Sequence, residues 1–336
     1  MTVQKGDISH RLGWLDSAKG IGIILVVIGH AWRGLNTAGL INNINLFQKV
    51  DTAIYSFHTP LFFLLSGLLI ERSLLAASAG SFVASRVQRL IWPLALWTWV
   101  FFLFKGLAGS LANKAADWAD FPIIPLPARE HFWFLWVLFV TQLASLMIKP
   151  VLRSSEHRLR GWVLFWFASV LLCLFRPPLG NFAPWLSDSV SSAPFFLLGA
   201  VVSGLRKYRP PVWLGLMAFA AFLGVVATSL YVPRFETVHL IIGSAACLLL
   251  CYSIMSLEEP LLSRKPFTAI GGLGRASMAI YVSSTIFSAA TRIVLVKAGI
   301  TDIASQMIIG TIVGLLFPAG LYIVAKRAKI LGALGF

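Results

Sequence analysis

Ten long apolar runs, bounded by charged residues or by Pro and Gly, constrain the fold of this chain more than any other feature. Each run is close to the ~20 residues that a helix needs to cross a bilayer. With 58% hydrophobic and 12% charged residues, the chain is far more apolar than soluble domains, which carry about 25% charged residues. The sequence therefore predicts an all-α polytopic membrane helix bundle. The expected spans are 19–36, 53–71, 90–108, 131–149, 161–176, 190–205, 212–232, 238–256, 277–296 and 303–325.

The positions of the basic residues predict the orientation. With the N-terminus inside, 19 of the 28 Lys and Arg residues fall in segments on that side, and every such segment carries at least three. The positive-inside rule then places both termini in the cytoplasm. The net charge of +15 follows mostly from this topology, and no nucleic-acid partner is expected.

Nothing predicts a second domain, so residues 1–336 are interpreted as one transmembrane domain. The longest expected outer segments are 37–52 and 109–130, and the second, rich in Trp, Pro and acidic residues, is expected to fold over an outer opening. No cleavable signal peptide is expected, because the first twenty residues are polar. All three cysteines lie in apolar runs and no Cys/His cluster has metal-ligand spacing, which predicts neither a disulfide framework nor a metal site.

The stretch DSAKGIGIILVVIGHAWR, residues 16–33, contains His30, the most unusual residue of the first span. Lys19 and His30 are eleven residues apart, so on a helix their side chains point in directions only about 20° apart around the axis. Asp16 and Arg33 lie near the same stripe. His30 lies roughly 16 Å further along the helix than Lys19. An ionisable residue inside a membrane is a functional-site hypothesis. The alternative is a structural hydrogen bond to a neighbouring helix.

The next two spans carry further polar residues. His58, in YSFHTPLFFLLSG, is expected about one turn inside the outer surface, where it is either an interfacial histidine or a neighbour of His30. Arg86 and Arg89, in SRVQRLIWP, are three residues apart and share a helix face. Arginine suits bidentate phosphate binding, and the alternative is a pair of charges that fix the topology.

Five motifs, in order, resemble those of acyltransferase family 3, in its sugar O-acetylase branch. The first helix, with Arg11, Lys19 and His30, resembles the basic residue and histidine signature of the family, with Lys19 where arginine is commoner. FHTPLFFLLSG, SRVQRLIWP, HFWFLWVLF and LGRASMAIYVSS are similar to the second, third, fourth and late segments. Ser284 occupies the place where many members have histidine.

The resemblance implies an O-acetyltransferase that moves an acetyl or other acyl group from cytoplasmic acyl-CoA to a sugar hydroxyl of an extracytoplasmic or lipid-linked glycan. Acetyl-CoA is then a co-substrate, and no permanently bound cofactor is expected. The expected location is the bacterial inner membrane among membrane lipids, and homo-oligomerisation is left open.

Residue roles follow from this expectation. His30 is the expected general base, because a sugar hydroxyl must lose its proton as it attacks the thioester. An acetyl-His30 intermediate is the competing version, and no carboxylate partner for His30 is visible. His58 is expected to orient the acceptor or to polarise the thioester carbonyl. The expected donor-binding residues are Arg11, Lys19, Arg86 and Arg89, and the acceptor or supporting residues are Asp16 (paired with Lys19 or Arg11), Arg33, Glu130, Trp133 and Ser284.

Two other functions stay open at this point. One is a transporter or flippase that uses His30 and His58 as proton relays. The other is a structural subunit of a glycan-export complex. The sequence shows no internal repeat and no carboxylate near the middle of a span, which favours the acyltransferase over the transporter.

Overall fold

The computed structural model describes residues 6–113, 118–128, 130–175, 183–207, 210–232 and 236–336. Every regular element in these ranges is helical, and ten stretches are long and apolar enough to cross a membrane. Both the all-α fold and the ten expected spans are therefore confirmed, and the protein is an integral membrane protein. The spans are Gly13–Thr37, Ile44–Ala76, Ala79–Leu111, Glu130–Leu152, Arg158–Phe175, Trp185–Gly204, Val212–Ser229, Thr237–Leu262, Ser277–Lys297 and Ile303–Arg327.

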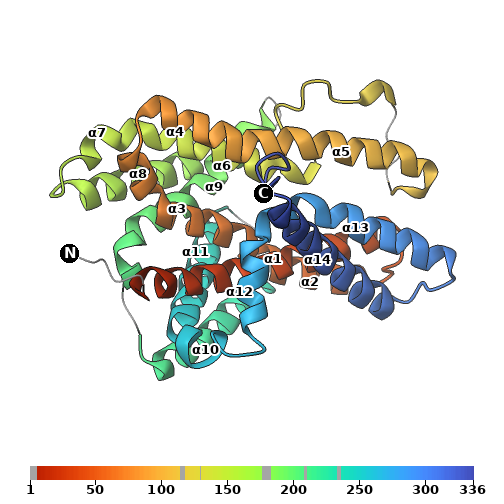
Figure 1. Ribbon diagram of the computed structural model, residues 1–336. Helices are drawn as coiled ribbons and strands as arrows, with labels where there is room; N and C mark the ends of the chain where they lie inside the picture. The colour runs from red at the N-terminus through yellow and green to blue at the C-terminus, as the bar shows by residue number, and fades with distance from the viewer. Residues whose placement is uncertain (1–5, 114–117, 129, 176–182, 208–209, 233–235) are drawn as a thin grey trace.

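The helices that make up these spans are labelled in Figure 1. Their bounds are α1 Gly6–Thr37, α2 Ile44–Tyr55, α3 His58–Ala76, α4 Ala79–Arg86, α5 Trp92–Ala108, α6 Trp133–Ala144, α7 Lys149–Leu152, α8 Arg158–Phe175, α9 Pro184–Val201, α10 Val212–Ser229, α11 Glu236–Leu257, α12 Thr268–Arg275, α13 Ser277–Lys297 and α14 Ile303–Arg327. Two π-helical segments, Val87–Ile91 and Glu258–Leu262, continue α4 and α11.

Helix α1 is the central helix of the bundle, and it packs against α2, α3, α11, α12, α13 and α14 (Figure 1). Its contact with α12 is backbone to backbone. A Cβ on Gly274 would overlap the carbonyl oxygen of Asp16, and a Cβ on Gly20 would overlap that of Ile270. Small residues permit such close helix approach inside membranes. The glycines beside Lys19 therefore fix how α1 sits in the bundle.

The second expected span is two helices rather than one. Asn43 caps α2 by accepting a hydrogen bond from the Leu46 amide, α2 ends at Tyr55, and α3 starts at His58. Pro60 lies in the first turn of α3, where its missing N–H leaves no hydrogen bond unmade. The break between Tyr55 and His58 turns both side chains toward one site.

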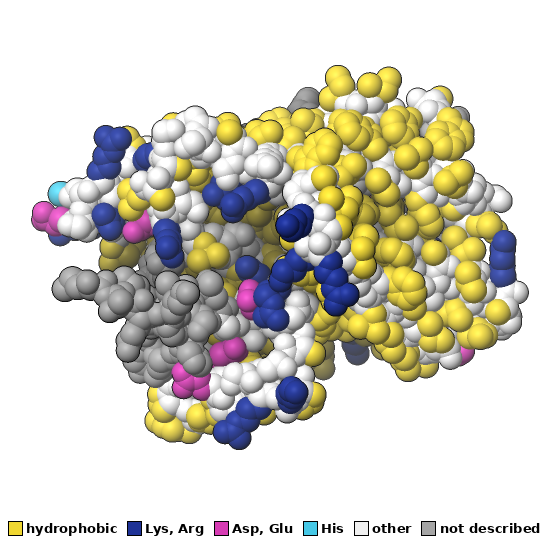
Figure 2. Space-filling view, viewed as in Figure 1, with side chains coloured by type: hydrophobic (Ala, Val, Ile, Leu, Met, Phe, Trp, Pro, Cys, Tyr) yellow, Lys and Arg dark blue, Asp and Glu magenta, His cyan; other side chains and the backbone are white. Residues whose placement is uncertain are grey.

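Charged side chains are unevenly distributed over the molecule. In Figure 2, Lys and Arg gather mainly over the half of the visible face that carries α4, α7, α10 and α12, whereas hydrophobic side chains cover most of the half that carries α5 and α13. This asymmetry agrees with the distribution that underlies the predicted orientation.

Candidate active site

Two cavities meet inside the bundle. The first, here the Lys19 cavity, has a volume of about 300 Å³ and runs from Lys19 to His30 between α1, α3, α6 and α13. The second, here the Arg33 cavity, has a volume of about 440 Å³ and is lined by residues of α1, α5 and α13 and by the segment before α6. Four residues line both cavities: His30, Tyr55, His131 and Trp133. The histidine that the sequence singled out therefore lies where the two cavities adjoin.

His30 lies on the face of α1 that the helical period predicted, since Lys19 and His30 line one cavity. Its side chain is half-buried, and its imidazole makes no hydrogen bond with any residue that the structure describes. Both ring nitrogens are therefore available to a molecule that enters either cavity. An imidazole in this position can accept a proton from one molecule and return it to another.

His131 is a site residue that the sequence reasoning did not select. It precedes α6 in the short helix Glu130–Phe132, and its ring meets the edge of the His30 ring with 5.5 Å between centroids. Its Nε2 lies 3.2 Å from Thr285 Oγ1, and its backbone carbonyl accepts a hydrogen bond from the Tyr281 hydroxyl. His131 is the first residue of HFWFLWVLF. By itself, a histidine at that position resembles a polar residue at the membrane interface, so the sequence alone did not mark it as part of a site.

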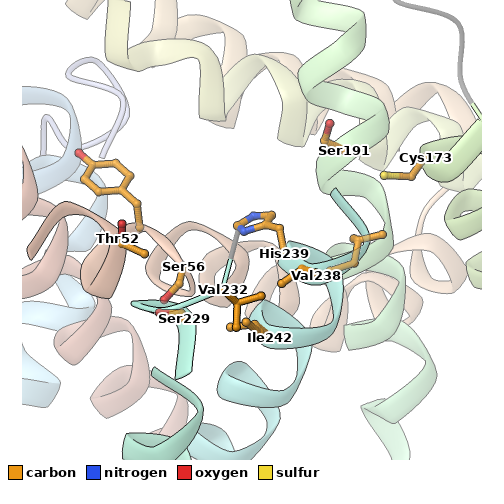
Figure 3. Close-up of a pocket in the computed structure, with 11 residues that line it drawn as sticks. Thr52, Ser56, Cys173, Ser191, Ser229, Val232, Val238, His239 and Ile242 are labelled. Atoms are coloured by element: carbon orange, nitrogen blue, oxygen red, sulfur yellow. The ribbon is translucent and has the colours of Figure 1, made fainter. Parts of the chain in front are cut away.

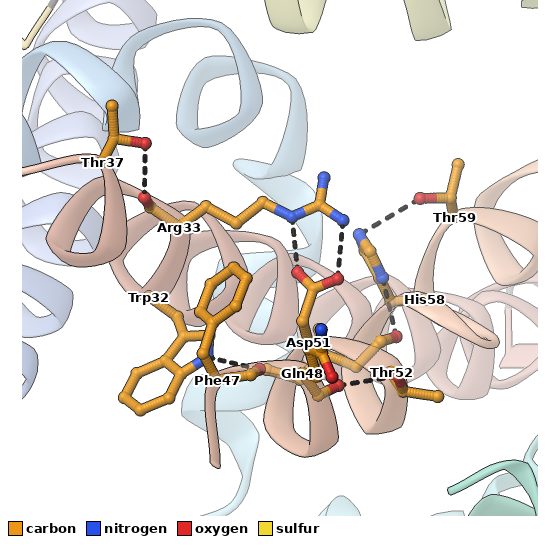
Figure 4. Close-up of polar contacts among 10 residues, drawn as sticks. Trp32, Arg33, Thr37, Phe47, Gln48, Asp51, Thr52, His58 and Thr59 are labelled. Atoms are coloured by element: carbon orange, nitrogen blue, oxygen red, sulfur yellow. Dashed lines mark hydrogen bonds and ion pairs between the residues drawn. The ribbon is translucent and has the colours of Figure 1, made fainter. Parts of the chain in front are cut away.

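His58 is buried, with 2% exposure, and its hydrogen bonds define its tautomer. Its Nδ1 lies 2.8 Å from the carbonyl oxygen of Ile54, which can only accept, so Nδ1 carries the proton. The neutral ring then accepts at Nε2, from the Thr59 hydroxyl at 3.1 Å (Figure 4). Neutral His58 therefore has no N–H to offer to the Lys19 cavity that it lines.

A carboxylate lies beside the site, although sequence reasoning identified none. Asp51 of α2 accepts two hydrogen bonds from Arg33, at 2.5 Å from Nε and 3.0 Å from Nη2 (Figure 4). The Arg33 guanidinium also lies over the Tyr55 ring, 3.2 Å from its centroid, and the Tyr55 ring meets that of His58 at 4.4 Å. A continuous chain of contacts thus leads from Asp51 through Arg33 and Tyr55 to His58.

The expected donor-binding residues of α1 are only partly placed in the cavity. Lys19 lines it, and the side chain of Arg11 lies outside the described residues. Asp16 forms an ion pair with Arg275 of α12, at 3.8 Å. The sequence reasoning expected Lys19 or Arg11 as its partner and did not anticipate Arg275. With the Arg11 side chain outside the described residues, the expected pairing stays a prediction.

Arg86 and Arg89 line neither the Lys19 cavity nor the Arg33 cavity. Arg86 is half-buried, with its guanidinium 4.7 Å from the centroid of Phe82 and its Nε without a hydrogen-bond partner in the described part of the chain. Arg89 is exposed. Arg86 ends α4 and Arg89 lies inside the turn of π-helix that begins at Val87, so the expected i, i+3 face is locally distorted.

The expected supporting residues divide between the cavities and the core. Glu130 lines the Arg33 cavity and forms a 2.9 Å ion pair with Lys105, and Trp133 lines both cavities. Ser284 is buried at 1% exposure and lines neither cavity, whereas the next residue, Thr285, reaches His131. Asn113, in the segment expected to fold over the outer opening, lines the Arg33 cavity.

A third cavity of about 350 Å³ lies between α2, α8, α9, α10 and α11 and contains His239 and Cys173 (Figure 3). It shares Tyr55 with the other two cavities but neither His30 nor His58. Among the described residues, no group of three or more His, Cys, Asp or Glu side chains could hold a metal ion.

The fold and the site together define a polytopic helical membrane protein with a histidine cluster between two cavities of its bundle. Residues 12–323 match the model of a family described as an acyltransferase domain, and the chain belongs to that family. The resemblance read from the five motifs is thereby confirmed.

Two curated relatives carry the same name. The chain is 29% identical over 227 residues to nodulation protein NolL of Mesorhizobium japonicum, covering 62% of this chain and 55% of the relative. It is 30% identical over 193 residues to nodulation protein NolL of Sinorhizobium fredii, covering 55% of this chain and 46% of the relative. The chain thus spans about half the length of these curated relatives. No solved structure is significantly similar to it.

Proposed function

We propose that this protein is a membrane O-acyltransferase that moves an acetyl or other acyl group from acyl-CoA to a sugar hydroxyl of a glycan. The observation that carries the proposal is the position of His30, whose ring faces two cavities and is free of hydrogen bonds within the described part of the chain. Two substrates can then approach one base from opposite sides. Membership of the acyltransferase family supports the reaction class.

Acyl-CoA enters the Lys19 cavity in this proposal. The positive-inside rule places the Lys19 end, and both termini, in the cytoplasm, where acyl-CoA is made. The walls between Lys19 and His30 are largely apolar, with Ile23, Val26 and Phe62 among them, which suits a pantetheine arm and an acyl group. Lys19 then binds a phosphate of CoA, with Arg86 and Arg89 as further phosphate ligands on the surface.

His30 acts as the general base. As the acceptor hydroxyl loses its proton to the imidazole, its oxygen forms a bond to the thioester carbonyl carbon. The C–S bond then breaks, and the imidazolium returns the proton to the CoA thiolate. In the competing version the acyl group first moves to His30 and then to the sugar.

The other two histidines serve His30 in this scheme. Neutral His58 has its proton on the Ile54 side, so we assign it to positioning Thr59 and Tyr55 rather than to polarising the thioester carbonyl. His131 holds the His30 ring edge-on between the cavities. The outer aromatic residue Trp133 offers a flat surface for a sugar ring.

Release of free CoA by the purified protein tests the proposal. Detergent-solubilised protein, acetyl-CoA and an oligosaccharide acceptor are expected to give CoA and an acetylated glycan in equal amounts. His30→Ala should lower the rate about 10²- to 10⁴-fold, the usual contribution of a general base. His157→Ala, which changes an exposed histidine, should keep the rate of the unmodified protein. A His30→Ala variant with full transfer activity would refute the catalytic assignment.

A transporter or flippase is the second candidate, because two cavities that adjoin in the membrane also suit alternating access. It predicts glycan movement without CoA release, in proteoliposomes that contain no acyl-CoA. The acyltransferase predicts CoA release by protein in detergent, where no membrane separates the substrates. We also propose that residues 1–336 act as one domain in the bacterial inner membrane.

A further inference from the structure

The Arg33 cavity contains a cation that no group in the described part of the chain neutralises. Arg33, Lys105 and Arg292 all line it. Arg33 is paired with Asp51 and Lys105 with Glu130. Arg292 forms no hydrogen bond or ion pair with any residue that the structure describes, although it is half-buried. The cavity wall is therefore positively charged at one defined place.

The Arg292 guanidinium lies close to the reacting histidine. It packs against Gly34 of α1, where a Cβ would stand 2.7 Å from Arg292 Nη1. Gly34 is four residues beyond His30, which is about 6 Å along the helix axis. A group bound at Arg292 would thus lie roughly one sugar ring away from a hydroxyl at His30. The nearby Asn113 side chain donates to the Gly34 carbonyl at 2.9 Å and lines the same cavity.

A half-buried guanidinium without an anion is poorly compensated, since burial disfavours an isolated charge. Its planar fork of donors matches the oxygens of a carboxylate or a phosphate. A neutral sugar would leave this charge unpaired, whereas an acidic one would complete the cavity.

We propose that Arg292 is an oxyanion-binding residue of the acceptor site, and that the acceptor is a sugar that carries a carboxylate or a phosphate next to the hydroxyl to be acylated. The inference rests on the proposed function and names its acceptor class. The oxyanion comes either from a uronic acid or from the phosphate that joins a sugar to its carrier. Both present a pair of negatively charged oxygens that the guanidinium fork can bind.

Three soluble probes of similar size separate these cases: a methyl glucoside, a methyl glucuronide and glucose 1-phosphate. Transfer from acetyl-CoA to each is measured with the full-length protein, together with the rise in Tm that each probe gives without acetyl-CoA. We expect the unmodified protein to prefer one of the acidic probes to the glucoside. Arg292→Gln should raise the KM for that acid about ten- to hundredfold, the usual effect of losing a charge-assisted hydrogen bond, and leave the KM for the glucoside unchanged.

Two more variants sharpen the test. Lys297→Gln removes an exposed positive charge from the same helix, outside the cavity, and should change neither KM. Gly34→Ala keeps the charge of Arg292 but displaces its guanidinium, and should weaken only the acidic probes.

The outcomes distinguish this inference from the proposed function. Equal KM values for all three probes in the unmodified protein would overturn the oxyanion site, although transfer itself would stand. An equal rise in KM for the glucoside and for the acidic probe in Arg292→Gln would overturn it as well. If no probe is acetylated, the proposed function fails. A Tm rise with an acidic probe that Arg292→Gln abolishes would still support the oxyanion site.

Discussion

Arg33 connects three helices at the end of the site. Its guanidinium binds Asp51 of α2 through two hydrogen bonds and covers the ring of Tyr55, which in turn meets His58 at the start of α3. Because Arg33 is three residues beyond His30 on α1, this chain of contacts sets the distance between the two histidines. Planarity and charge are both needed, so lysine cannot replace the arginine.

The Arg33–Asp51 pair should therefore show strong coupling. Arg33→Ala and Asp51→Ala are each expected to lower Tm and kcat, and the double variant should lose much less than the sum. We expect a coupling free energy of about 1–3 kcal/mol, typical of residues in one network. Thermal unfolding and CoA-release rates of the four proteins measure it. Strict additivity would mean that the ion pair does not hold the site together.

On the donor side, Lys19 alone of the placed candidates lines the cavity. Lys19→Ala should raise the KM for acetyl-CoA about tenfold with kcat nearly unchanged, because a phosphate contact contributes equally to ground state and transition state. Arg160→Ala, which changes an exposed residue of α8, is the matched control.

Variants of Arg86 and Arg89 test separately whether arginines at the surface contribute to binding acyl-CoA. If the pair binds the CoA phosphates, the double alanine variant also raises this KM. An unchanged KM would leave the two arginines as charges that fix the topology.

The sequence predicted which residues lie together when they belong to one helix. It did not predict the neighbours that come from different helices. Lys19 and His30 share a cavity because both follow the period of α1. Asp51, His131 and Arg292 reach the site only through the packing of α2, of the short helix before α6, and of α13. The helical period of one segment carries no information on that packing. The roles assigned to His30 and the other residues stay predictions until the variants are measured.

Among the elements, α3 and α9 approach each other as closely as α1 and α12. A Cβ on Gly67 of α3 would overlap the carbonyl oxygen of Phe196, and a Cβ on Gly199 of α9 would overlap that of Leu64. Inside a membrane the hydrophobic effect does not drive helices together, so close backbone contact of this kind stabilises the helix pair through van der Waals packing. Since α3 begins with His58, the contact also supports the position of that ring.

Gly67→Ala should accordingly push α3 away from α9. We expect a loss of about 1–3 kcal/mol in stability, the usual effect of overpacking, together with lower activity. Gly224→Ala, in the exposed middle of α10 with open space at its Cβ position, should leave Tm unchanged. Equal Tm values for the two variants would mean that the helices separate without cost.

The ten spans were predictable because each is a long apolar run with charged or Gly and Pro boundaries. Shorter features could not be predicted from the sequence. The break between α2 and α3 depends on two residues, and α12 has only eight. Neither is long enough to give a periodic signal, yet α12 provides the partner of Asp16.

For the whole molecule, the orientation is the property that determines which substrate reaches which cavity. In a background with Cys173, Cys247 and Cys251 replaced by Ala, we expect Thr301→Cys, between α13 and α14, to react with a membrane-impermeant maleimide in intact cells. Glu156→Cys, between α7 and α8, should react only after the cells are opened. Both positions are exposed in the structure. The reverse pattern would contradict the predicted orientation.

The sharing of His30 by two cavities also makes the proposed reaction vectorial. In the proposed reaction, free CoA would leave on the Lys19 side and the new ester on the Arg33 side, so the two products would enter different compartments. Reversal would need the ester at the Arg33 cavity while CoA occupies the Lys19 cavity, so the ratio of CoA to acyl-CoA in the cytoplasm would set the direction of transfer. The acyl-CoA supply of the cytoplasm would thereby control the acylation of a glycan on the other side of the bilayer.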